Sequence, residues 1–408
     1  MKIVYLSPSA QLGGAETSLL DILASMRAAR PDWSLHLVVS DEGPLVQRAT
    51  ALGVETRVLP FPKSLSALGD AGAGGPAGRQ QSLFALCAGC FAAGPAVVQY
   101  IRRLRFYLRE LSPDLIHTNG LKMHLLGIRS APKGVPVIWH IHDYIGARPL
   151  MGQLLRLHSK RPAMAIANSA SVASDVRATC GTRLRVETVY NGVDLERFSP
   201  TGPISDLDAL AGLPPAAPGT VRVGMLSTMA RWKGHAIFLR ALSLLPQGLQ
   251  VRGYIISGAL YQTNGSQSSL VDLKKLVQKL DLSHRVGFTG YLERPAEAMR
   301  ALDIVVHAST EPEPFGLVIA EGMACGRAVI ASHAGGAAEL ITAGRDALGH
   351  PPGDACLLAS SIERLTMDAD LRARLGRAAR ETALDRFDRS RLAGELVPLY
   401  QAATAPAH

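Results

Sequence analysis

The sequence predicts an α/β protein with two doubly wound, Rossmann-like domains, a cleft between them and a helical C-terminal tail. In the first half, short apolar runs alternate with amphipathic helical patterns, which indicates parallel strands covered on both faces. The same alternation starts afresh in the second half, after a Pro- and Gly-rich stretch at 199–218. A chain of 408 residues is long enough to bury two separate cores.

The expected strands are short apolar runs, with helices in most of the gaps. In the first half they are Ile3–Leu6, Leu35–Val39, Thr56–Leu59, Leu115–His117, Val137–Ile141, Ala163–Ala167 and Glu187–Tyr190. In the second half they are Val221–Leu226, Val251–Ile256, Arg285–Phe288, Ile304–His307 and Ala328–Ala331, with Ala347–His350 as a further candidate. Residues 1–198 are therefore expected to form the first domain and residues 199–385 the second. A helix and tail at 386–408 are expected to cross back to the first domain.

One region of the first half departs from the alternation. Residues 67–78 are rich in glycine and predict a flexible loop. Residues 99–110 then predict a basic amphipathic helix, with four arginines between apolar positions at helical spacing. Such a helix either packs on the sheet or lies on a membrane surface.

The charge and composition of the chain limit the classes of molecule that it is expected to bind. Residues 1–200 carry 22 basic and 14 acidic residues, whereas residues 201–408 carry 21 and 20, so the net charge of +9 lies mainly in the first half. An anionic membrane surface or a phosphorylated acceptor suits this basic half. Nucleic acid is not expected as a partner, because no nucleic-acid-binding motif is present and aromatic residues make up only 5% of the chain.

Cysteine usage and hydropathy indicate the compartment. Five cysteines in a chain of this length do not form a disulfide framework, and Cys87–Cys90 has redox or zinc spacing without a second ligand pair. The N-terminus lacks the pattern of a signal peptide, and no apolar run is long enough for a spanning helix. We expect a cytoplasmic protein, with peripheral contact to the inner face of the membrane through the first domain.

The most informative segment runs from Glu313 to Glu321. It follows a buried strand, 303–307, and a short loop, and a helix is expected from about Phe315 to Cys325. The first N–H groups of a helix have no partner within it, and together with the helix dipole they form an anion site. Glu313 lies in the loop beside this site, and Glu321 lies about two turns along the helix.

Three other segments follow expected strands. Gly13 and Gly14 precede the first helix and allow a phosphate or sugar to approach the backbone. Arg231 and Lys233 lie two residues apart in a loop, where both can reach a diphosphate. His142 ends the fifth strand; its side chain is expected to point away from that of His140 unless the strand has already ended, and it is a candidate for orienting substrate or transferring a proton.

Two pairs of acids imitate a metal-binding D-x-D motif. Asp206 and Asp208 fall in the region between the two domains, and Asp368 and Asp370 fall between tail helices. Neither pair ends an apolar strand, so no metal site and no cofactor are expected. If a diphosphate binds, its negative charge would instead be neutralised by Arg231, Lys233 and the helix N-terminus.

Several segments in this order resemble the retaining glycosyltransferases of family 4, which have the GT-B fold. The resemblance covers nearly the whole chain and includes the E-x7-E motif of Glu313 and Glu321 and the pair Arg231 and Lys233. The remaining segments are Gly13–Glu16, Ala167–Ser169, Val189–Asp194 with Phe198, Gly322–Gly326 and Gly335–Glu339.

The resemblance implies roles for individual residues. Glu313 would contact the donor sugar or its leaving group, and Glu321 the ribose hydroxyls. Arg231 and Lys233 would hold the diphosphate. The further implied contacts are the backbone N–H groups of Phe315, Gly316 and Leu317 with the sugar and diphosphate, Gly13 and Gly14 with the donor, His142 with the sugar and acceptor hydroxyl, and Tyr291 with the base.

The predicted activity is metal-independent transfer of a sugar from a nucleotide diphosphate to a hydroxyl, with retained configuration. A UDP-sugar is the favoured donor and GDP-mannose the second choice; the acceptor is a glycan, a lipid-linked glycan or a small metabolite. Replacing Glu313 by alanine is expected to affect turnover far more than stability. The alternatives are a GT-B epimerase or phosphorylase, or a non-catalytic nucleotide-sugar-binding protein. Two departures from the family pattern, the close spacing of Arg231 and Lys233 and the presence of Asn119, would alter donor or acceptor choice.

Overall fold

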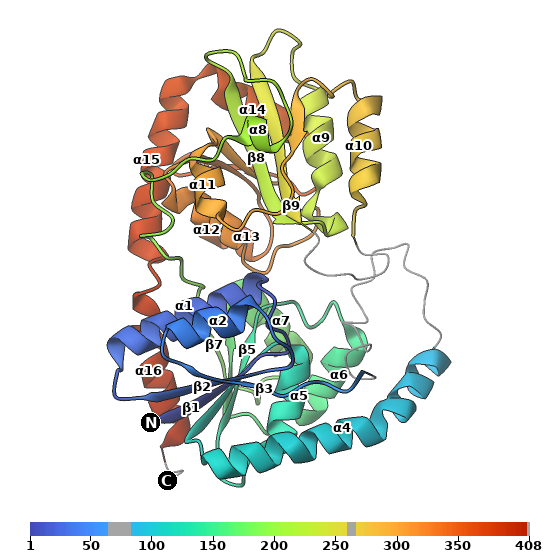
Figure 1. The fold of residues 1–408 in the computed structure, drawn as a ribbon, viewed down its shortest axis with the longest axis vertical. Coiled ribbons are helices and arrows are strands. Elements are labelled where there is room, and N and C mark those ends of the chain that lie inside the picture. The colour runs from blue at the N-terminus through green and yellow to red at the C-terminus, as the bar shows by residue number, and fades with distance from the viewer. Residues whose placement is uncertain (64–82, 259–266, 406–408) are drawn as a thin grey trace. The chain divides into compact units, whose positions relative to one another are not determined.

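The computed structural model describes residues 1–63, 83–258 and 267–405 (Figure 1). Within 83–258, it describes side chains only from residue 94 onward. It divides into two compact units, and each unit is built around its own parallel sheet. Unit 1 consists of Met1–Gly192 and the residues from Arg389 onward, and unit 2 of Val193–Asp388. The glycine-rich segment at 67–78 lies outside the described residues.

In the described part of unit 1 the sheet has seven strands in the order β3-β2-β1-β4-β5-β6-β7. Every neighbouring pair is parallel. The strand order reverses between β1 and β4, and in such sheets ligands bind where the strands on either side of a reversal end. The bounds are β1 Lys2–Leu6, β2 Ser34–Val39, β3 Glu55–Val58, β4 Leu115–Asn119, β5 Val137–Ile141, β6 Met164–Ala167 and β7 Val186–Thr188.

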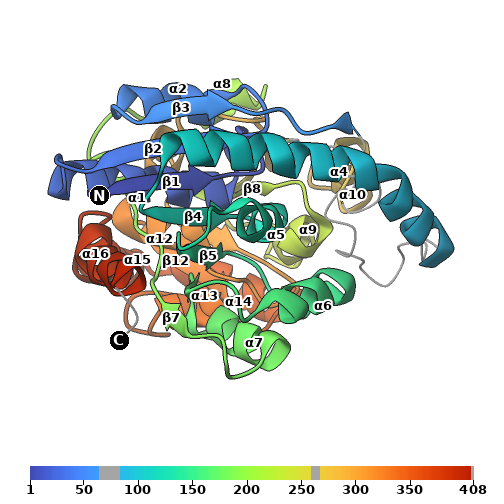
Figure 2. The ribbon, with the colours of Figure 1, turned by 90° about the horizontal axis from the view of Figure 1, so that it is seen from below.

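Two layers of helices cover this sheet, as Figure 2 shows from below. Right-handed crossovers place the helices that follow β3, β4, β5 and β6 on one face, where they bury one apolar core. Helices α1, α2 and α16 bury a second core on the other face. The bounds are α1 Gly14–Ala29, α2 Pro44–Ala51, α4 Leu83–Leu111, α5 Leu121–Ser130, α6 Pro149–His158, α7 Ala170–Cys180 and α16 Arg391–Thr404.

Helix α4 is much longer than the predicted helix at 99–110. It begins at Leu83 and continues through Pro95 to Leu111. Its first half contains no charged residue, so it shows no alternation of polar and apolar positions from which a helix could be predicted. Tyr100, Leu104 and Leu108 are buried, so this helix packs on the sheet with one side. Among the described residues, no helix combines the length and apolar character needed to cross a bilayer.

The described part of unit 2 contains a six-stranded parallel sheet in the order β10-β9-β8-β11-β12-β13. Each strand overlaps the run predicted from the sequence. The strands are β8 Val221–Thr228, β9 Val251–Gly258, β10 Val286–Phe288, β11 Ile304–His307, β12 Ala328–Ser332 and β13 Leu348–His350. The helices are α8 Leu207–Leu210, α9 His235–Ser243, α10 Leu270–Lys279, α11 Pro295–Arg300, α12 Leu317–Ala324, α13 Gly336–Leu340, α14 Ala355–Met367 and α15 Ala369–Arg386.

The division between the units differs from the predicted boundaries. The stretch after residue 198 is not a free linker, because the Arg300 guanidinium donates hydrogen bonds to the carbonyl oxygens of Arg197, Ser199 and Pro203 and so fixes it to unit 2. Unit 2 therefore begins at Val193 and ends at Asp388. Helix α16 packs against α1 in unit 1, where the Ala393 N–H donates to Ser25 Oγ at 2.9 Å.

Candidate functional site

The start of α12 is built by a strand, a short loop and a glycine. Strand β11 ends at His307, and helix α12 begins at Leu317, slightly later than predicted. Gly316 caps the helix with φ of 96°, a left-handed conformation that side chains rarely adopt. A Cβ atom here would also lie 2.9 Å from Ile319 Cδ1. The glycine thus turns the chain sharply and leaves the first N–H groups of α12 at the end of the strand.

Glu313 lies in this loop and is almost completely buried, with 6% of its surface exposed. Lys233 Nζ donates to both of its carboxylate oxygens, at 2.9 and 2.8 Å. Ser309 Oγ donates to Oε2 at 2.8 Å, and His307 Nε2 lies 3.0 Å from the same oxygen. Oε2 thus receives three of these contacts and Oε1 one, so the carboxylate is held mainly through Oε2.

The charge of Glu313 follows from these neighbours. Burial alone would raise the pKa of Glu313, but the Lys233 ammonium and the hydrogen bond from His307 outweigh it and hold the pKa below its ordinary value. The backbone is fixed as well, since Gly336 N–H donates to the Glu313 carbonyl oxygen at 2.7 Å. Glu313 is therefore a rigidly held carboxylate paired with a cation, and it is suited to positioning the Lys233 ammonium.

Arg231 and Lys233 lie on a single 3-10 turn, η1 Arg231–Lys233, which follows β8. The Trp232 carbonyl oxygen accepts from Thr310 N–H at 2.7 Å, which ties this turn to the loop that carries Glu313. Lys233 Nζ also lies 4.0 Å from the centroid of the Trp232 ring. Arg231 is exposed and donates from Nε to the Gln267 carbonyl oxygen at 3.2 Å.

Gly234 allows η1 to approach β11 closely. Its φ is 82°, and a Cβ atom built on it would overlap the Ala308 carbonyl oxygen. No other residue type fits this position without displacing the backbone. The two cations therefore lie on one compact turn, which Gly234 allows to pack closely against the end of the strand.

The other candidate site residues in unit 2 differ in how far they are exposed to solvent. Glu321 is half-buried on α12, and Leu317 is half-buried at its start. Phe315 is buried and packs edge-on against Phe387 with ring centroids 6.3 Å apart, so its side chain belongs to the core and only its backbone remains a candidate for contact with a ligand. Tyr291 follows β10 with 53% of its surface exposed. The hydrogen bonds join Lys233 directly to Glu313, whereas Arg231 and Tyr291 are placed by the loops that follow β8 and β10, and Glu321 by helix α12.

In unit 1 the predicted residues also lie where strands end. Gly13 caps α1, and its N–H donates to Glu16 Oε2 at 3.1 Å. Asn119, at the end of β4, donates from Nδ2 to the Ala15 carbonyl oxygen at 3.3 Å. Its Oδ1 lies 2.5 Å from His142 Nε2. One amide thus links the glycine turn to His142.

The rings of His140 and His142 do not diverge: their centroids lie 4.1 Å apart. Strand β5 ends at Ile141, so His142 lies beyond it, the case in which divergence was not expected. Residues two apart along an extended chain in any case face the same side. His117 continues the stack, 5.1 Å from His140, and its Nδ1 lies 2.8 Å from Tyr400 Oη on α16. We call His117, His140 and His142 the histidine stack.

The histidine stack is uncharged at neutral pH. Burial lowers the pKa of His117 to about 3 and that of His142 to about 4, and it lowers the pKa of His140 well below its ordinary value. Among the described residues, neither ring nitrogen of His140 has a hydrogen-bond partner. His142 therefore presents a neutral imidazole, because its burial disfavours the charged form.

Two site residues, His307 and Ser309, were missed by sequence reasoning. They fix the carboxylate of Glu313 from the end of β11. Their place after an apolar strand is the same signal that identified Glu313, but spacing alone does not reveal which side chains will be hydrogen-bonded.

The paired acids have structural roles. Asp206 and Asp368 accept hydrogen bonds from the first turns of α8 and α15, as helix caps do. Asp208 is buried and accepts from Arg252 and Tyr254, each at 2.6 Å. No cluster of three or more metal-ligating side chains occurs in the described residues. The side chains of Cys87 and Cys90 lie outside the described part.

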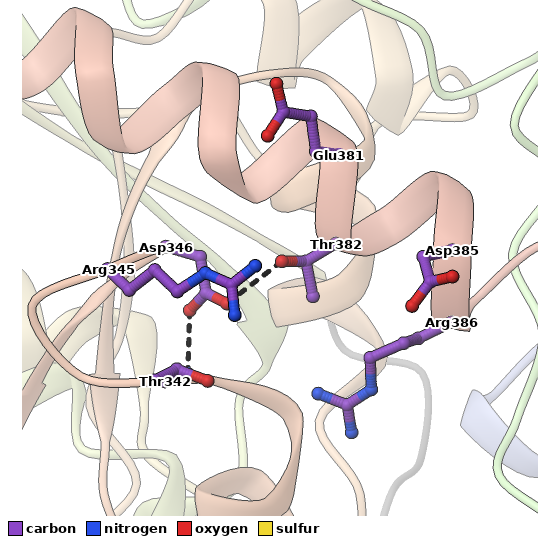
Figure 3. A pocket seen from close by; sticks show the side chains of 7 residues that line it. All are labelled: Thr342, Arg345, Asp346, Glu381, Thr382, Asp385 and Arg386. Carbon is purple, nitrogen blue, oxygen red and sulfur yellow. Dashed lines mark hydrogen bonds between the residues drawn. The ribbon is translucent and has the colours of Figure 1, made fainter.

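Unit 2 also has a polar pocket of about 220 Å³, shown in Figure 3. Asp346 is held there by the Thr342 N–H and by Thr382 Oγ1, at 2.7 and 2.9 Å. Arg386 donates to the Glu339 carbonyl oxygen at the end of α13. None of the predicted site residues lines this pocket, which brings together mainly groups that stabilise the turn after α13.

Comparison with known proteins identifies the family. Residues 12–197 match "Glycosyltransferase Family 4", and residues 216–382 match "Glycosyl transferases group 1". A D-inositol 3-phosphate glycosyltransferase of Nocardiopsis dassonvillei is 30% identical over 315 residues, covering 72% of this chain and 71% of the relative. A protein of the same name from Saccharomonospora viridis is 27% identical over 98% of this chain and 93% of its own.

Solved structures agree with this assignment. The Anabaena protein HepE, in complex with UDP and glucose, superimposes with a TM-score of 0.79 at 26% identity, covering 98% of this chain and 100% of that one. Sucrose-phosphate synthase from Thermosynechococcus elongatus shares the fold, with a TM-score of 0.76 at 20% identity. The two Rossmann-like units, the order of the motifs and these matches together show that the chain belongs to glycosyltransferase family 4, with the GT-B fold.

Proposed function

We propose that this glycosyltransferase moves a sugar from a nucleoside diphosphate to an acceptor hydroxyl with retained anomeric configuration. The donor is a UDP-sugar in preference to GDP-mannose. The observation that carries the proposal is the pairing of Lys233 with a buried, ionised Glu313 beside the N-terminus of α12. This arrangement holds a cation and a set of backbone N–H groups in fixed positions before any ligand arrives, which favours charge that develops on a leaving diphosphate.

The diphosphate would be bound by unit 2. Lys233 and the exposed Arg231 supply two positive side chains from one turn, and the backbone N–H groups of Phe315, Gly316 and Leu317 supply the anion site of α12. These groups neutralise the leaving group without a metal ion or other cofactor. Glu321 on the same helix would bind the ribose hydroxyls, and the exposed Tyr291 would lie near the base.

Glu313 has a double task in this proposal. Of its four hydrogen-bond contacts with Lys233, His307 and Ser309, three are on Oε2 and one is on Oε1, so contact with the donor sugar would share Oε1 or exchange a partner at Oε2. Its first effect is to orient Lys233, whose third N–H can then point toward a phosphate. We do not assign it the role of a nucleophile, because its charge is already engaged with a cation.

Unit 1 would contribute neutral groups. Gly13 and Gly14 allow the donor to approach the backbone, and His142 would contact the sugar and the acceptor hydroxyl. A neutral imidazole can donate or accept a hydrogen bond but does not compete for the diphosphate as a cation. The leaving phosphate itself would take the acceptor proton, in a reaction on one face of the sugar.

The relatives support the donor class. HepE was solved with UDP and with UDP-glucose, and the relatives from Nocardiopsis dassonvillei and Saccharomonospora viridis carry the name glycosyltransferase. The acceptor would be a hydroxyl of a glycan, a lipid-linked glycan or a small metabolite. We place the protein in the cytoplasm or on the inner face of the membrane.

The test is incubation of the full chain with a panel of nucleotide sugars, followed by mass spectrometry for released nucleotide. One donor should be hydrolysed slowly in the absence of acceptor, and proton NMR of the first product should show the anomeric configuration of the donor. Interconversion of two nucleotide sugars without release of nucleotide would instead establish an epimerase. Binding of a nucleotide sugar without turnover in any acceptor mixture would establish a non-catalytic binding protein.

A further inference from the structure

Helix α6 in unit 1 carries an exposed apolar stripe. Leu150, Leu154 and Leu157 have 43%, 37% and 78% of their surfaces exposed. Their spacing of four and three residues places them in one row along the helix. The opposite side of the helix is anchored, since Leu155 is fully buried in the core. The exposure of the leucines is therefore not the result of a poorly packed helix.

The last turn of the same helix and the turn that follows it are basic. Arg156, Lys160 and Arg161 are exposed, and no acidic residue occurs between Arg148 and Arg161. Leucines with flanking cations are the composition of a helix that lies in the interface of an anionic bilayer. The positive charges on this apolar face would repel the same face of a second copy of this chain. The face is therefore poorly suited to pairing with such a copy.

Helix α4 in the same layer has the same combination. Helix α5 lies between α4 and α6 and contacts both (Figure 2). Phe106 on α4 has 64% of its surface exposed, and three exposed arginines, 102, 103 and 109, lie near it. The exposed apolar and basic groups thus recur on two helices of one face of the sheet.

We propose that this face of unit 1, the α6 stripe with its three cations and the outer side of α4 near Phe106, binds the surface of an anionic phospholipid bilayer. The leucines and the phenylalanine enter the boundary between headgroups and acyl chains, and the cations remain among the phosphates. Each cation near such a surface contributes roughly a five-fold increase in affinity. The inference is independent of the donor chemistry, because none of the residues assigned to the donor takes part.

The experiment is sedimentation of the full chain with vesicles of phosphatidylglycerol and phosphatidylcholine, compared with vesicles of phosphatidylcholine alone. Binding should require the anionic lipid and should weaken as salt is raised. The triple variant Leu150→Gln/Leu154→Gln/Leu157→Gln should lose at least about ten-fold in partitioning, because its leucines no longer leave water. Arg156→Gln/Lys160→Gln/Arg161→Gln should lose on the order of a hundred-fold.

Matched controls come from unit 2. Leu210→Gln/Leu244→Gln/Leu384→Gln changes three leucines that are 46–55% exposed, and Lys274→Gln/Lys275→Gln/Lys279→Gln removes three exposed cations from α10. Both should sediment with vesicles nearly as the wild type does, and all variants should keep the wild-type thermal transition. The proposal is overturned if the wild type ignores anionic vesicles or if the leucine variant binds them fully. A concentration-dependent dimer that only the leucine variant abolishes would also overturn it, by showing that the face binds another copy of the chain.

Discussion

The two units bury polar groups at the ends of parallel strands in opposite ways. In unit 2 the groups are charged and paired, as the Lys233–Glu313 ion pair with His307 and Ser309 shows. In unit 1 they are uncharged imidazoles, and His140 finds no hydrogen-bond partner in the described residues. The same fold thus produces a fixed pair of charges in one unit and a neutral, polarisable stack in the other.

The difference has an energetic meaning. A buried ion pair is expensive to break, because removing one partner leaves the other charge in a medium of low polarity. A neutral imidazole costs less to bury but cannot take up a proton without a penalty. Unit 2 should therefore be sensitive to the removal of either charge, and unit 1 to acid.

The largest effect is expected from Glu313→Ala. Turnover should fall by about a thousand-fold, because Lys233 is no longer oriented. The free energy of unfolding should also fall by about 3–5 kcal/mol, since the Lys233 ammonium is left unpaired. This revises the expectation from sequence that turnover would be affected far more than stability. Initial rates and urea denaturation measure the two effects.

A second variant separates the two effects of Glu313. Glu313→Ala/Lys233→Met removes both charges and should regain much of the lost stability without regaining turnover. Equal stability of the single and double variants would contradict the importance of the ion pair in unit 2.

Gly234→Ala should destabilise unit 2 by at least about 3 kcal/mol, because the new methyl group meets the Ala308 carbonyl oxygen in addition to the backbone strain. Gly134→Ala is its control in unit 1. Gly134 has φ of 85° but nothing within 4 Å of a Cβ atom, so it should lose only about 1 kcal/mol. Similar losses in thermal unfolding would show that η1 is not pinned against the strand end.

Ser309→Ala should cost about 1.5–3 kcal/mol, the range for a hydrogen bond to a charged group. Ser227→Ala is a matched variant, because Ser227 Oγ lies 3.0 Å from His235 Nε2, a neutral imidazole in the same unit. It should cost about 1 kcal/mol. If chemical denaturation gave the larger loss for Ser227→Ala, the charge at Glu313 would not be what makes this network strong.

Counted per histidine and per pH unit, the smallest effect is expected from pH. The histidine stack has lowered pKa values when folded, so the unfolded chain binds more protons and the stability of unit 1 falls as pH drops below about 6.5. Each such histidine contributes at most about 1.4 kcal/mol per pH unit. Unit 2 also buries imidazoles with lowered pKa values, His235 and His350, so it loses some stability over the same range, but with two such groups against the three of the histidine stack. The lowered pKa of Glu313 adds a loss in unit 2 only below about pH 4.3.

Native-state hydrogen exchange, corrected for intrinsic rates, can follow β4 and β5 separately from β11 and β12. Between pH 6.5 and 5 the protection of β4 and β5 should fall more steeply than that of β11 and β12. His140→Leu should reduce the slope in unit 1 by up to one proton. An equal slope in both units would mean that the imidazoles are not held neutral.

Much of the fold could be predicted from the sequence. Parallel strands buried on both faces are short continuous apolar runs, so β5 and β11 were located to the residue. Helix α4 was predicted only in part, because its first half is uniformly apolar and has no helical period. The boundary between the units was displaced because the guanidinium of Arg300 fixes a Pro- and Gly-rich stretch that would otherwise be a linker.

The sequence predicts candidate members of the site but not the contacts between them. Strand ends and a glycine before a helix pointed to Glu313, Arg231, Lys233 and His142 as candidates. The pairing of Lys233 with Glu313 and the stacking of His142 on His140 depend on side-chain geometry across elements far apart in the sequence. Such contacts leave no periodic signal in a single sequence.

The central claim is that Arg231, Lys233 and the start of α12 bind a nucleoside diphosphate. Isothermal titration calorimetry of UDP with the wild type and with Arg231→Gln tests it most directly, because Arg231 is exposed and its loss should leave the fold intact. The account predicts that UDP binds the wild type and that the variant binds at least about ten-fold more weakly, the effect of one charge-assisted hydrogen bond. Unchanged affinity in the variant would contradict it.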